Sequence, residues 1–266
     1  MWTIEKKTQV GEGGNNMIFS LASDIGKVRK NNEDFVDAKI ICKDDETKIG
    51  IFALADGMGG HNKGEVASLM AVNGIIEFLS ESLSQSGNIK IDYFDDIIKQ
   101  AYNQVNYSIL EKSKEDESFN GMGTTLVTVV IYNDDMYVAN VGDSRCYIMR
   151  DEELKRITID HSVVEDLVRM NIISEEEAMT HPIRNHITRA MGTDEMVIVD
   201  IFRKKLKPHD KILMATDGLT GYVLDDKIKE LLKKDEDLDV VTKNLINFAN
   251  EVSGKDNTSV ILIQKS

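Results

Sequence analysis

The 266-residue sequence predicts an α+β fold, in which groups of short strands alternate with pairs of longer helices. Short apolar runs rich in β-branched residues recur along the chain and are separated by turn-forming residues. Two longer segments in the first half instead repeat their apolar residues at helical spacing. Only 2 prolines are present, and no Ser/Gly-rich stretch marks a linker. We therefore predict one domain over residues 1–266, with residues 1–16 as a candidate N-terminal extension.

The expected elements follow one another along the chain. Three strands come first, at 17–23, 34–42 and 49–55. Two helices, each with one apolar face, are expected at 65–83 and 93–111. A run of four strands comes next, at 124–132, 136–141, 145–149 and 154–157. The remainder is expected to hold two short helices, two strands, a helix and a last strand, at 163–171, 174–180, 197–202, 211–216, 238–252 and 259–263.

Two of the apolar runs end in the dipeptide Asp-Gly. The run IFALADG ends on Asp56 and Gly57, the run ILMATDG ends on Asp217 and Gly218, and Asp256 stands just before the last strand. Carboxylates held at rigid strand ends can converge on a hard divalent cation such as Mg²⁺ or Mn²⁺. Asp-Gly after a strand is equally typical of a hairpin turn, and spacing alone leaves both interpretations open.

Six motifs in a fixed order favour the metal interpretation. Residues 23–34 (SDIGKVRKNNED) resemble the opening motif of the protein phosphatase 2C family, the metal-dependent Ser/Thr phosphatases, and residues 56–61 (DGMGGH) resemble its second motif. The other four follow in the family's order, as GMGTT at 121–125, GDSR at 142–145, ATDGL at 215–219 and DNT at 256–258. The resemblance covers residues 23–263 and indicates a protein phosphatase 2C-like catalytic domain, most similar to the stand-alone bacterial branch.

The resemblance implies a fold and a chemistry. The implied fold is an αββα sandwich of two antiparallel β-sheets flanked by helix pairs, with a flap segment near 161–192. The implied activity is hydrolysis of phosphoserine and phosphothreonine in proteins, by direct attack of a water or hydroxide that bridges two metal ions, Mn²⁺ or Mg²⁺. The implied metal ligands are the Asp56 carboxylate, the Gly57 carbonyl, Asp217, Asp256 and, largely through water, Glu33.

The resemblance also assigns two side chains to catalysis. Arg29 is expected to bind the substrate phosphate, because a guanidinium can donate to two of its oxygens. His61 is the candidate general acid that protonates the leaving serine or threonine oxygen. The plain structural alternatives are a solvated surface charge for Arg29 and a turn residue for His61. Asp34 is a weaker candidate than Glu33, because neighbouring residues of an extended stretch point to opposite faces.

Other motif positions are interpreted as scaffold. Asp143 in GDSR is expected in a tight turn, and the GMGTT segment is expected to bring a strand close to the site. Some members of the family share a third metal between the equivalent of Asp217 and an acidic residue just before GMGTT. Ser118 and Asn120 stand near that place here, with Asp116 and Glu117 slightly further off. This departure argues against a firmly held third metal.

Charge and composition restrict the partners. The formal net charge of −14 argues against nucleic acid and anionic membranes. No run approaches a membrane span in length, and residues 1–20 are too polar for a signal peptide. The two cysteines, Cys42 and Cys146, lack metal-motif spacing and are interpreted as reduced, partly buried thiols. We expect a cytoplasmic monomer in bacterial signalling, acting on phosphorylated proteins that include a Ser/Thr kinase and its targets.

Two functions of other classes stay open on the sequence. One is a two-metal phosphoester hydrolase of other specificity, such as a nuclease, but the acidity and the lack of a basic or aromatic surface weigh against nucleic acid. The other is a catalytically weak interaction protein on the same fold. The intact set of Asp56, Asp217, Asp256 and Arg29 weighs against that second alternative.

Overall fold

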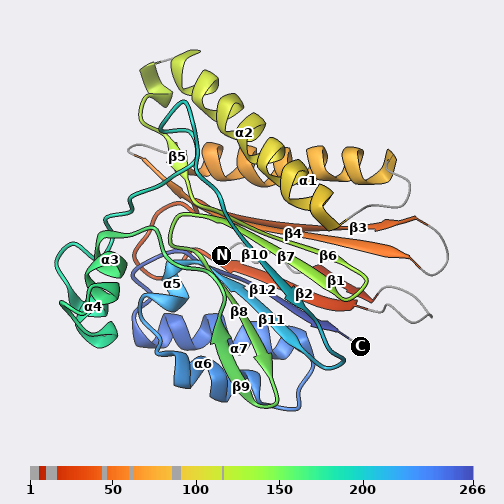
Figure 1. Ribbon diagram of the computed structural model, residues 1–266. Coiled ribbons are helices and arrows are strands. Elements are labelled where there is room, and N and C mark those ends of the chain that lie inside the picture. Colours follow the sequence, from red (N-terminus) through yellow and green to blue (C-terminus); the bar gives the residue numbers. More distant parts are fainter. Residues whose placement is uncertain are drawn as a thin grey trace.

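Two antiparallel β-sheets stacked face to face form the centre of the protein, and helices cover the outer face of each sheet (Figure 1). The computed structural model describes residues 6–9, 17–43, 47–59, 63–85, 91–115 and 117–265. This arrangement confirms the predicted α+β class and the αββα sandwich.

The first sheet joins segments from opposite ends of the sequence. Its six strands are, in spatial order, β1 (Lys6–Gln9), β2 (Met17–Asp24), β12 (Thr258–Lys265), β11 (Lys211–Ala215), β8 (Arg145–Arg150) and β9 (Glu153–Arg156). Because β2 pairs with β12, Asp24 lies opposite Thr258. The loop that follows β2 therefore lies beside the loop that precedes β12.

The second sheet carries the long strand that ends at the candidate site. Its spatial order is β10 (Asp200–Lys205), β7 (Asp135–Val141), β6 (Leu126–Tyr132), β4 (Lys48–Met58) and β3 (Asp34–Cys42), and the short β5 (Gly123–Thr124) pairs with the end of β4. The start of β3 reaches the first sheet, because the Thr216 hydroxyl donates to Asp34 Oδ2 over 3.0 Å. The candidate site lies where these ends of the two sheets meet.

The helices form three groups. The second sheet is covered by α1 (Gly64–Gln85) and α2 (Ile91–Glu115), and a 3₁₀ turn η1 (Glu117–Phe119) follows. The first sheet is covered by α5 (Asp217–Thr220), α6 (Asp225–Leu232) and α7 (Leu238–Val252). Two short helices, α3 (Val163–Arg169) and α4 (Glu175–Thr180), stand apart at one end of the sandwich (Figure 1). We call residues 161–192, which contain them, the flap.

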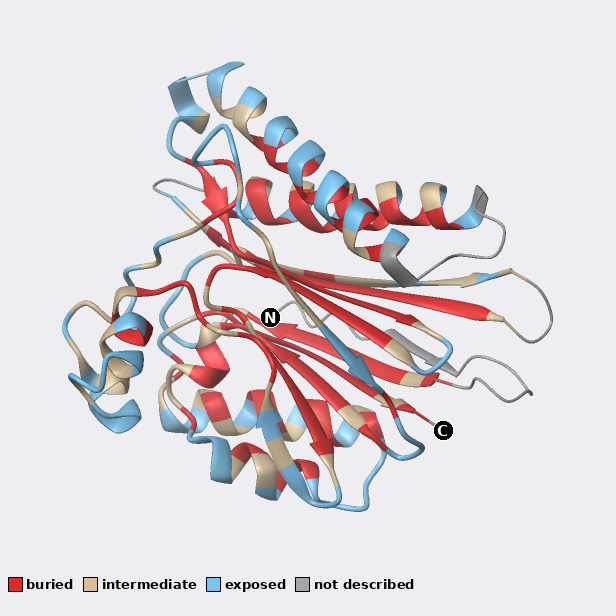
Figure 2. Cartoon of the chain, viewed as in Figure 1, coloured by how far each residue is buried: buried red, intermediate tan, exposed pale blue. Residues whose placement is uncertain are grey.

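Apolar side chains fill three layers, and most strands are buried over most of their length, whereas β3, β9 and β10 are more exposed (Figure 2). In the central layer, between the sheets, Phe19 of β2 meets Phe52 of β4 edge to face, with ring centroids 5.2 Å apart. Burial of a side chain of this size stabilises the fold by roughly 1.5–3 kcal/mol. The strands that lead to the candidate site are thus anchored in well-packed core.

Helix α1 is an apolar core helix. By length and composition it is the one helix of the described chain that could cross a membrane, so the expectation that no segment approaches such a span in length is wrong. Half of that segment is buried, and Ala71, Ile75 and Leu79 belong to the layer between the helices and β4. Its apolar character follows from this packing.

Most predicted elements occur close to their predicted positions, and the helix predicted at 238–252 matches α7 at both ends. The strand predicted at 197–202 is β10, which begins and ends three residues later. Val197 and Val199 pack against the helical layer instead of pairing in the sheet. Helices α5 and α6 are absent from the prediction. Of the candidate extension 1–16, only Lys6–Gln9 is described, and it forms an edge strand beside β2.

Both flap helices lie where the sequence predicts them, and their caps explain where they begin. The Ser162 side chain accepts from the Glu165 N–H at the start of α3. At α4 the Ser174 hydroxyl accepts from the Glu177 N–H while the Glu177 carboxylate accepts from the Ser174 N–H, which is a complete capping box.

Candidate active site

Asp56 stands near the end of β4, and its peptide groups are fixed by the neighbouring GMGTT segment. Its N–H donates to Thr125 Oγ1 over 2.9 Å. Its carbonyl accepts from the Thr124 hydroxyl (2.9 Å) and the Thr125 N–H (2.8 Å). Thr125 Oγ1 also lies 2.8 Å from Ser144 Oγ in the GDSR segment. The two threonines therefore hold the backbone from which the Asp56 carboxylate projects.

Neither Asp-Gly dipeptide forms a hairpin turn. Asp56 and Gly57 lie inside β4, which continues to Met58, whereas Asp217 and Gly218 begin α5. Neither glycine has a positive φ, so a left-handed backbone is not the reason for glycine at these positions. The reason is close approach of two backbone segments, which a side chain would prevent.

Gly57 lets the start of α1 pack against the end of β4. A Cβ on Gly57 would stand 2.1 Å from the Gly64 carbonyl oxygen and 2.6 Å from the Glu33 carbonyl oxygen. The Gly57 N–H donates to that Glu33 carbonyl over 3.0 Å. The end of β4, the residue before β3 and the first turn of α1 are thereby joined at one point.

Gly218 likewise allows α5 to pack closely against the loop before β12. A Cβ on Gly218 would stand 1.9 Å from the Asn257 carbonyl oxygen. The Thr216 N–H also donates to the Ser259 carbonyl over 3.1 Å. The first turn of α5, with Asp217, is therefore held directly against the loop that carries Asp256.

We expect Gly218→Ala to weaken Mn²⁺ binding by about tenfold or more, the range seen when the support of a ligand is lost. The added Cβ meets a backbone carbonyl, so α5 and the 254–257 loop must separate and take Asp217 and Asp256 with them. Isothermal titration calorimetry with Mn²⁺ measures the change. Gly74→Ala is the matched control, because its Cβ meets only a side chain in the α1–α2 contact. Equal Mn²⁺ affinity in both variants would contradict the expectation.

Asn257 organises the loop that follows β2. Its Nδ2 donates to the carbonyls of Ile25 (2.9 Å) and Asn31 (3.0 Å), and its Oδ1 accepts from the Glu33 N–H over 2.9 Å. One amide side chain thus fixes both ends of the loop 25–33. The sequence names Asn257 only as a member of the DNT motif, because the partners that reveal its role lie at the other end of the chain.

The same loop makes direct backbone contact with the loop before β12. Gly26 has φ +80°, and a Cβ there would stand 2.3 Å from the Asp256 carbonyl oxygen. The Lys27 N–H donates to the Gly254 carbonyl over 2.7 Å. The segment that carries Arg29 and the segment that carries Asp256 therefore form one unit.

Arg29 and Asp256 form an ion pair within this unit. Arg29 Nη2 lies 2.9 Å from both carboxylate oxygens of Asp256. The Arg29 side chain is 46% exposed and that of Asp256 is 15% exposed. A guanidinium carries five N–H donors, so this pair leaves donors for an anion from solution. Arg29 is thus partly exposed, which agrees with the alternative of a solvated surface charge, but it also forms an ion pair with a predicted metal ligand.

Glu33 and Asp34 both reach the site, which corrects the lower rank given to Asp34. Glu33 precedes β3 and is not part of an extended strand, so the alternation argument does not apply to this pair. Asp34 lies directly opposite Asp56 in the antiparallel pairing, and opposed residues share a face of the sheet. Asp34 Oδ2 accepts from Thr216, and its buried Oδ1 has no hydrogen-bond partner.

Asp143 also belongs to this group, although the sequence assigns it only to a turn. It follows Gly142 between β7 and β8, as predicted, and it lines the same cavity as Asp217. Burial, followed by the negative charges of Asp217 and Asp160, raises the pKa of Asp143 well above its ordinary value. No local signal distinguishes this carboxylate from that of an ordinary turn residue.

The clustered carboxyl groups repel one another. Burial, then the charges of Asp34 and Asp217, raise the pKa of Asp56 well above its ordinary value. Burial is also the main cause that raises the pKa of Asp34 to about 7 and that of Asp217 to about 6. Asp256 forms an ion pair with Arg29, whereas the carboxyls of Asp34, Asp56 and Asp217 lie next to one another. Without added positive charge, the cluster therefore resists full ionisation.

These residues fit hard divalent ions. Carboxylate and carbonyl oxygens are the donors that Mg²⁺ and Mn²⁺ prefer. The Oδ1 atoms of Asp34 and Asp217 are buried without a hydrogen-bond partner, and a cation would satisfy both. In the described part of the chain, no group of three or more His, Cys, Asp or Glu side chains is arranged to hold an ion alone. Ions of the Mg²⁺ type bind through one or two carboxylates and keep several waters, which agrees with such an incomplete set.

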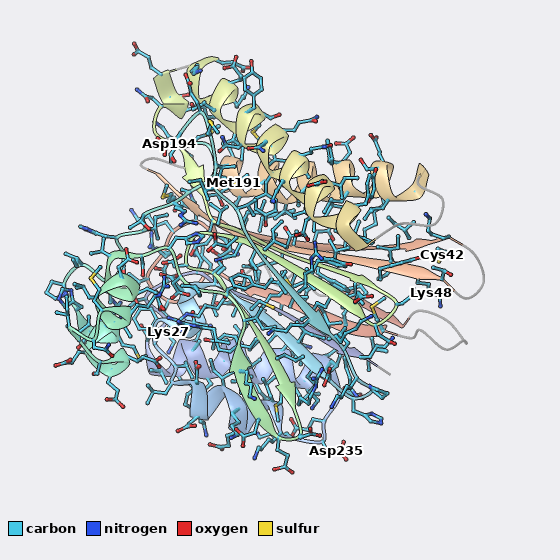
Figure 3. The ribbon with its side chains drawn as sticks, viewed as in Figure 1. Lys27, Cys42, Lys48, Met191, Asp194 and Asp235 are labelled. Atoms are coloured by element: carbon cyan, nitrogen blue, oxygen red, sulfur yellow. The ribbon has the colours of Figure 1, made fainter. Side chains whose placement is uncertain are left out.

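Three further sequence candidates, His61 and the two cysteines, add nothing to the described cluster. His61, the predicted general acid, lies in residues 60–62, outside the described part of the chain. Cys42 is exposed at the end of β3 farthest from the flap (Figure 3), and Cys146 is buried, which raises the pKa of its thiol. The expectation of partly buried thiols is thus wrong for both, since Cys42 is exposed and Cys146 is fully buried, and neither cysteine offers a nucleophile at the site.

The chain is similar to known phosphatases over most of its length. Residues 27–260 match the family described as Protein phosphatase 2C. The serine/threonine phosphatase stp of Listeria monocytogenes serotype 4b (strain F2365) is 36% identical over 243 residues, which cover 91% of this chain and 94% of the relative. A solved S. agalactiae serine/threonine phosphatase superposes with a TM-score of 0.85 at 34% identity, over 94% of this chain and 100% of that one. The catalytic domain of the phosphatase PstP, in complex with 2 manganese ions, superposes with a TM-score of 0.79 at 30% identity, over 94% of this chain and 98% of that one.

Proposed function

Because the chain belongs to the protein phosphatase 2C family and is a serine/threonine phosphatase, we propose that it hydrolyses phosphoserine and phosphothreonine in proteins with two divalent metal ions. The observation that carries the proposal is the buried cluster of Asp34, Asp56 and Asp217, which adjoins the Arg29–Asp256 pair. The PstP structure with 2 manganese ions supports the choice of metal class.

The residues that would hold the ions are Asp56, the Gly57 carbonyl, Asp217, Asp256 and, through water, Glu33. When bound, the two ions supply positive charge and a water of lowered pKa that can attack phosphorus. The side chains of the protein bind the substrate and donate the proton. Arg29 donates to phosphate oxygens and orients the phosphorus, and its contact with Asp256 couples that orientation to the ligand loop. His61 would donate a proton to the leaving oxygen of serine or threonine.

One assay tests the proposal. Phosphate release is measured from a phosphothreonine peptide and from the same peptide with phosphotyrosine, each with Mn²⁺, Mg²⁺ or a chelator. We expect hydrolysis of phosphothreonine that depends on the metal, with a clear preference over phosphotyrosine. Activity that survives the chelator would overturn the metal mechanism, and equal rates on both peptides would overturn the substrate class.

Loss of Arg29 should mainly weaken substrate binding. We expect Arg29→Ala to raise KM for a phosphothreonine peptide by about tenfold or more, because charge-assisted hydrogen bonds to phosphate contribute roughly 1.5–3 kcal/mol. The effect on kcat should be smaller. Lys30→Ala is the matched control, since it removes the same charge from the same exposed loop. A similar KM for both variants would leave Arg29 as a surface charge.

Loss of His61 should instead act on kcat and should depend on the leaving group. We expect His61→Gln to lower kcat on a phosphothreonine peptide by about 100-fold, within the usual range for general acid catalysis. An aryl phosphate, whose leaving group needs little protonation, should lose far less. A loss of equal size on both substrates would contradict the role of general acid.

The remaining expectations about the cell and the assembly are also proposals. We propose one catalytic domain, cytoplasmic and monomeric, whose substrates include a Ser/Thr kinase and its targets. We also propose that no third metal is held firmly, since Ser118 and Asn120 offer no carboxylate at the expected place. Equilibrium dialysis that finds three tightly bound Mn²⁺ ions per chain would contradict this last proposal.

A further inference from the structure

A cavity lies beneath the flap and extends from the acidic cluster. It has a volume of about 170 Å³ and is bounded by α3 and α4 on one side and by α5 and the turn into α6 on the other. Asp143 and Asp217 line it where it adjoins the candidate active site. The cavity is therefore continuous with the place where the substrate phosphate binds in the proposed function.

Much of the cavity wall is apolar. Six aliphatic or thioether side chains line it, namely Val164, Val168, Ala178, Met179, Val223 and Leu224. Both flap helices and the segment after α5 contribute to this set. Val164 and Val223 are almost fully buried, whereas Leu224 is 54% exposed at the rim. The space is thus apolar inside and open to a chain that arrives from solvent.

Four of the charged groups of the wall form two ion pairs, whereas Asp143 and Asp217 stand at the end of the cavity that adjoins the acidic cluster. Arg145 donates three hydrogen bonds of 2.7–3.1 Å to the Asp160 carboxylate. Arg156 donates to both oxygens of Glu165, at 2.7 and 2.8 Å. A charged side chain that reaches these two pairs would have to break one of them or remain uncompensated, which is costly in a buried place. The part of the wall that the pairs form therefore favours an uncharged guest.

Arg184 closes the cavity by joining the flap to the body of the protein. Its Nη1 donates to the Met179 carbonyl (2.8 Å) and to the Gly221 carbonyl (3.2 Å). Its guanidinium carbon lies 4.4 Å from the centre of the Tyr222 ring. These contacts hold the two walls at a defined separation, so the cavity can discriminate between side chains by size.

We infer that this cavity is a substrate subsite, which takes one large apolar side chain from the residues that flank the phosphorylated serine or threonine. The inference rests on the proposed function and adds a sequence preference to it. An apolar cavity of about 150 Å³ accommodates benzene, so this one has room for a leucine, methionine or phenylalanine side chain. An extended peptide advances about 3.3 Å per residue, so a residue near the phosphorylated one can reach beneath the flap.

A set of phosphothreonine peptides tests the preference. Each of the three residues on either side of phosphothreonine is replaced in turn by leucine, alanine, lysine or glutamate in an otherwise constant peptide, and kcat/KM is measured with Mn²⁺. We expect leucine at one flanking position to exceed alanine by at least about tenfold, with no such gain for lysine or glutamate. Equal values at every position, or a preference for lysine or glutamate, would overturn the inference.

A matched pair of variants ties the preference to this cavity. Ala178→Trp fills the space from α4, whereas Glu176→Trp places the same side chain at an exposed position of that helix that does not line the cavity. We expect the leucine-to-alanine ratio to fall to about one in Ala178→Trp and to stay at its original value in Glu176→Trp. A folded Ala178→Trp protein that keeps the ratio would place the subsite elsewhere.

A second variant covers the case in which Ala178→Trp does not fold. Val168→Ala enlarges the cavity from α3, and we expect the preferred side chain to change from leucine to a larger one such as phenylalanine or tryptophan. An unchanged order would again overturn the inference. The peptide set also separates the two proposals: hydrolysis of all peptides without preference removes the subsite alone, whereas no hydrolysis of any peptide removes the proposed function and the subsite with it.

Discussion

Asp56→Asn should abolish most phosphatase activity and, at the same time, make the metal-free protein more stable. Asparagine keeps the volume but removes the ligand charge, so we expect activity to fall at least about 100-fold. Without metal, the same change removes a buried carboxyl that Asp34 and Asp217 repel, so the Tm should rise by roughly 5 °C. Peptide hydrolysis and calorimetry in the presence of a chelator measure the two effects.

Asparagine variants of three other carboxylates serve as controls for Asp56→Asn. Asp217→Asn should also lose activity and gain metal-free stability, because its carboxyl lies in the same cluster. Asp256→Asn should lose activity without the gain, because its carboxylate is paired with Arg29. Asp210→Asn should lose stability and keep activity, since Arg150 holds that buried carboxylate at 2.6 and 2.8 Å far from the cluster. Near-normal turnover of Asp56→Asn at limiting Mn²⁺ would show that Asp56 is not a ligand.

The metal-free protein should lose stability as the pH rises. A carboxyl whose pKa is higher in the folded chain than in the unfolded chain favours folding at low pH, and this advantage is lost as the pH passes its folded value. For Asp217 and Asp34 the folded values are about 6 and about 7, so the loss extends from about pH 4 to about pH 7. One pKa unit corresponds to about 1.4 kcal/mol, so Asp217 costs on the order of 3 kcal/mol and Asp34 on the order of 4 kcal/mol. We expect the Tm with chelator to fall by roughly 10 °C between pH 5 and pH 8.

Two comparisons isolate this effect from other titrating groups. Burial lowers the pKa of His161, which adds stability as the pH rises and therefore opposes the trend. The His161 contribution cancels when the metal-free Tm of the natural protein is subtracted from that of Asp217→Asn. This Tm difference should grow as the pH rises. Saturating Mn²⁺ should flatten or invert the trend, because bound cations stabilise the ionised carboxylates. A metal-free Tm that rises steadily from pH 5 to pH 8 in the natural protein but not in Asp217→Asn would contradict the account.

The sequence predicts those residues of the candidate site that belong to short, contiguous motifs. Asp56, Asp217, Asp256 and Arg29 each stand in a motif of a few residues, and the structure brings all four to one end of the sandwich. Amphipathic helices such as α7 are predicted because their period depends only on near neighbours. The capping box at Ser174 is equally local.

Features that depend on contacts between distant segments escape the prediction. The role of Asp34 follows from its register with β4 and from Thr216, and no pattern within residues 23–34 encodes either contact. The glycines after Asp56 and Asp217 are typical of turns, whereas their function is to admit a backbone from another element. β10 is an edge strand that pairs only with β7 among the described strands. The apolar residues just before it are as typical of a strand as those within it, so the sequence places its start too early.

The pairing of β2 with β12 has a consequence for the moment at which the enzyme becomes active during its synthesis. Translation delivers Arg29, Glu33 and Asp56 early, whereas Asp256 follows Asp56 by 200 residues and β12 comes after it. β12 lies between β2 and β11, so the first sheet cannot close around a nascent chain that still lacks it. Contacts of such long sequence separation form late in folding. We therefore expect a nascent chain that lacks β12 to hold the second sheet and its helices, yet to remain inactive until β12 has paired with β2 and β11.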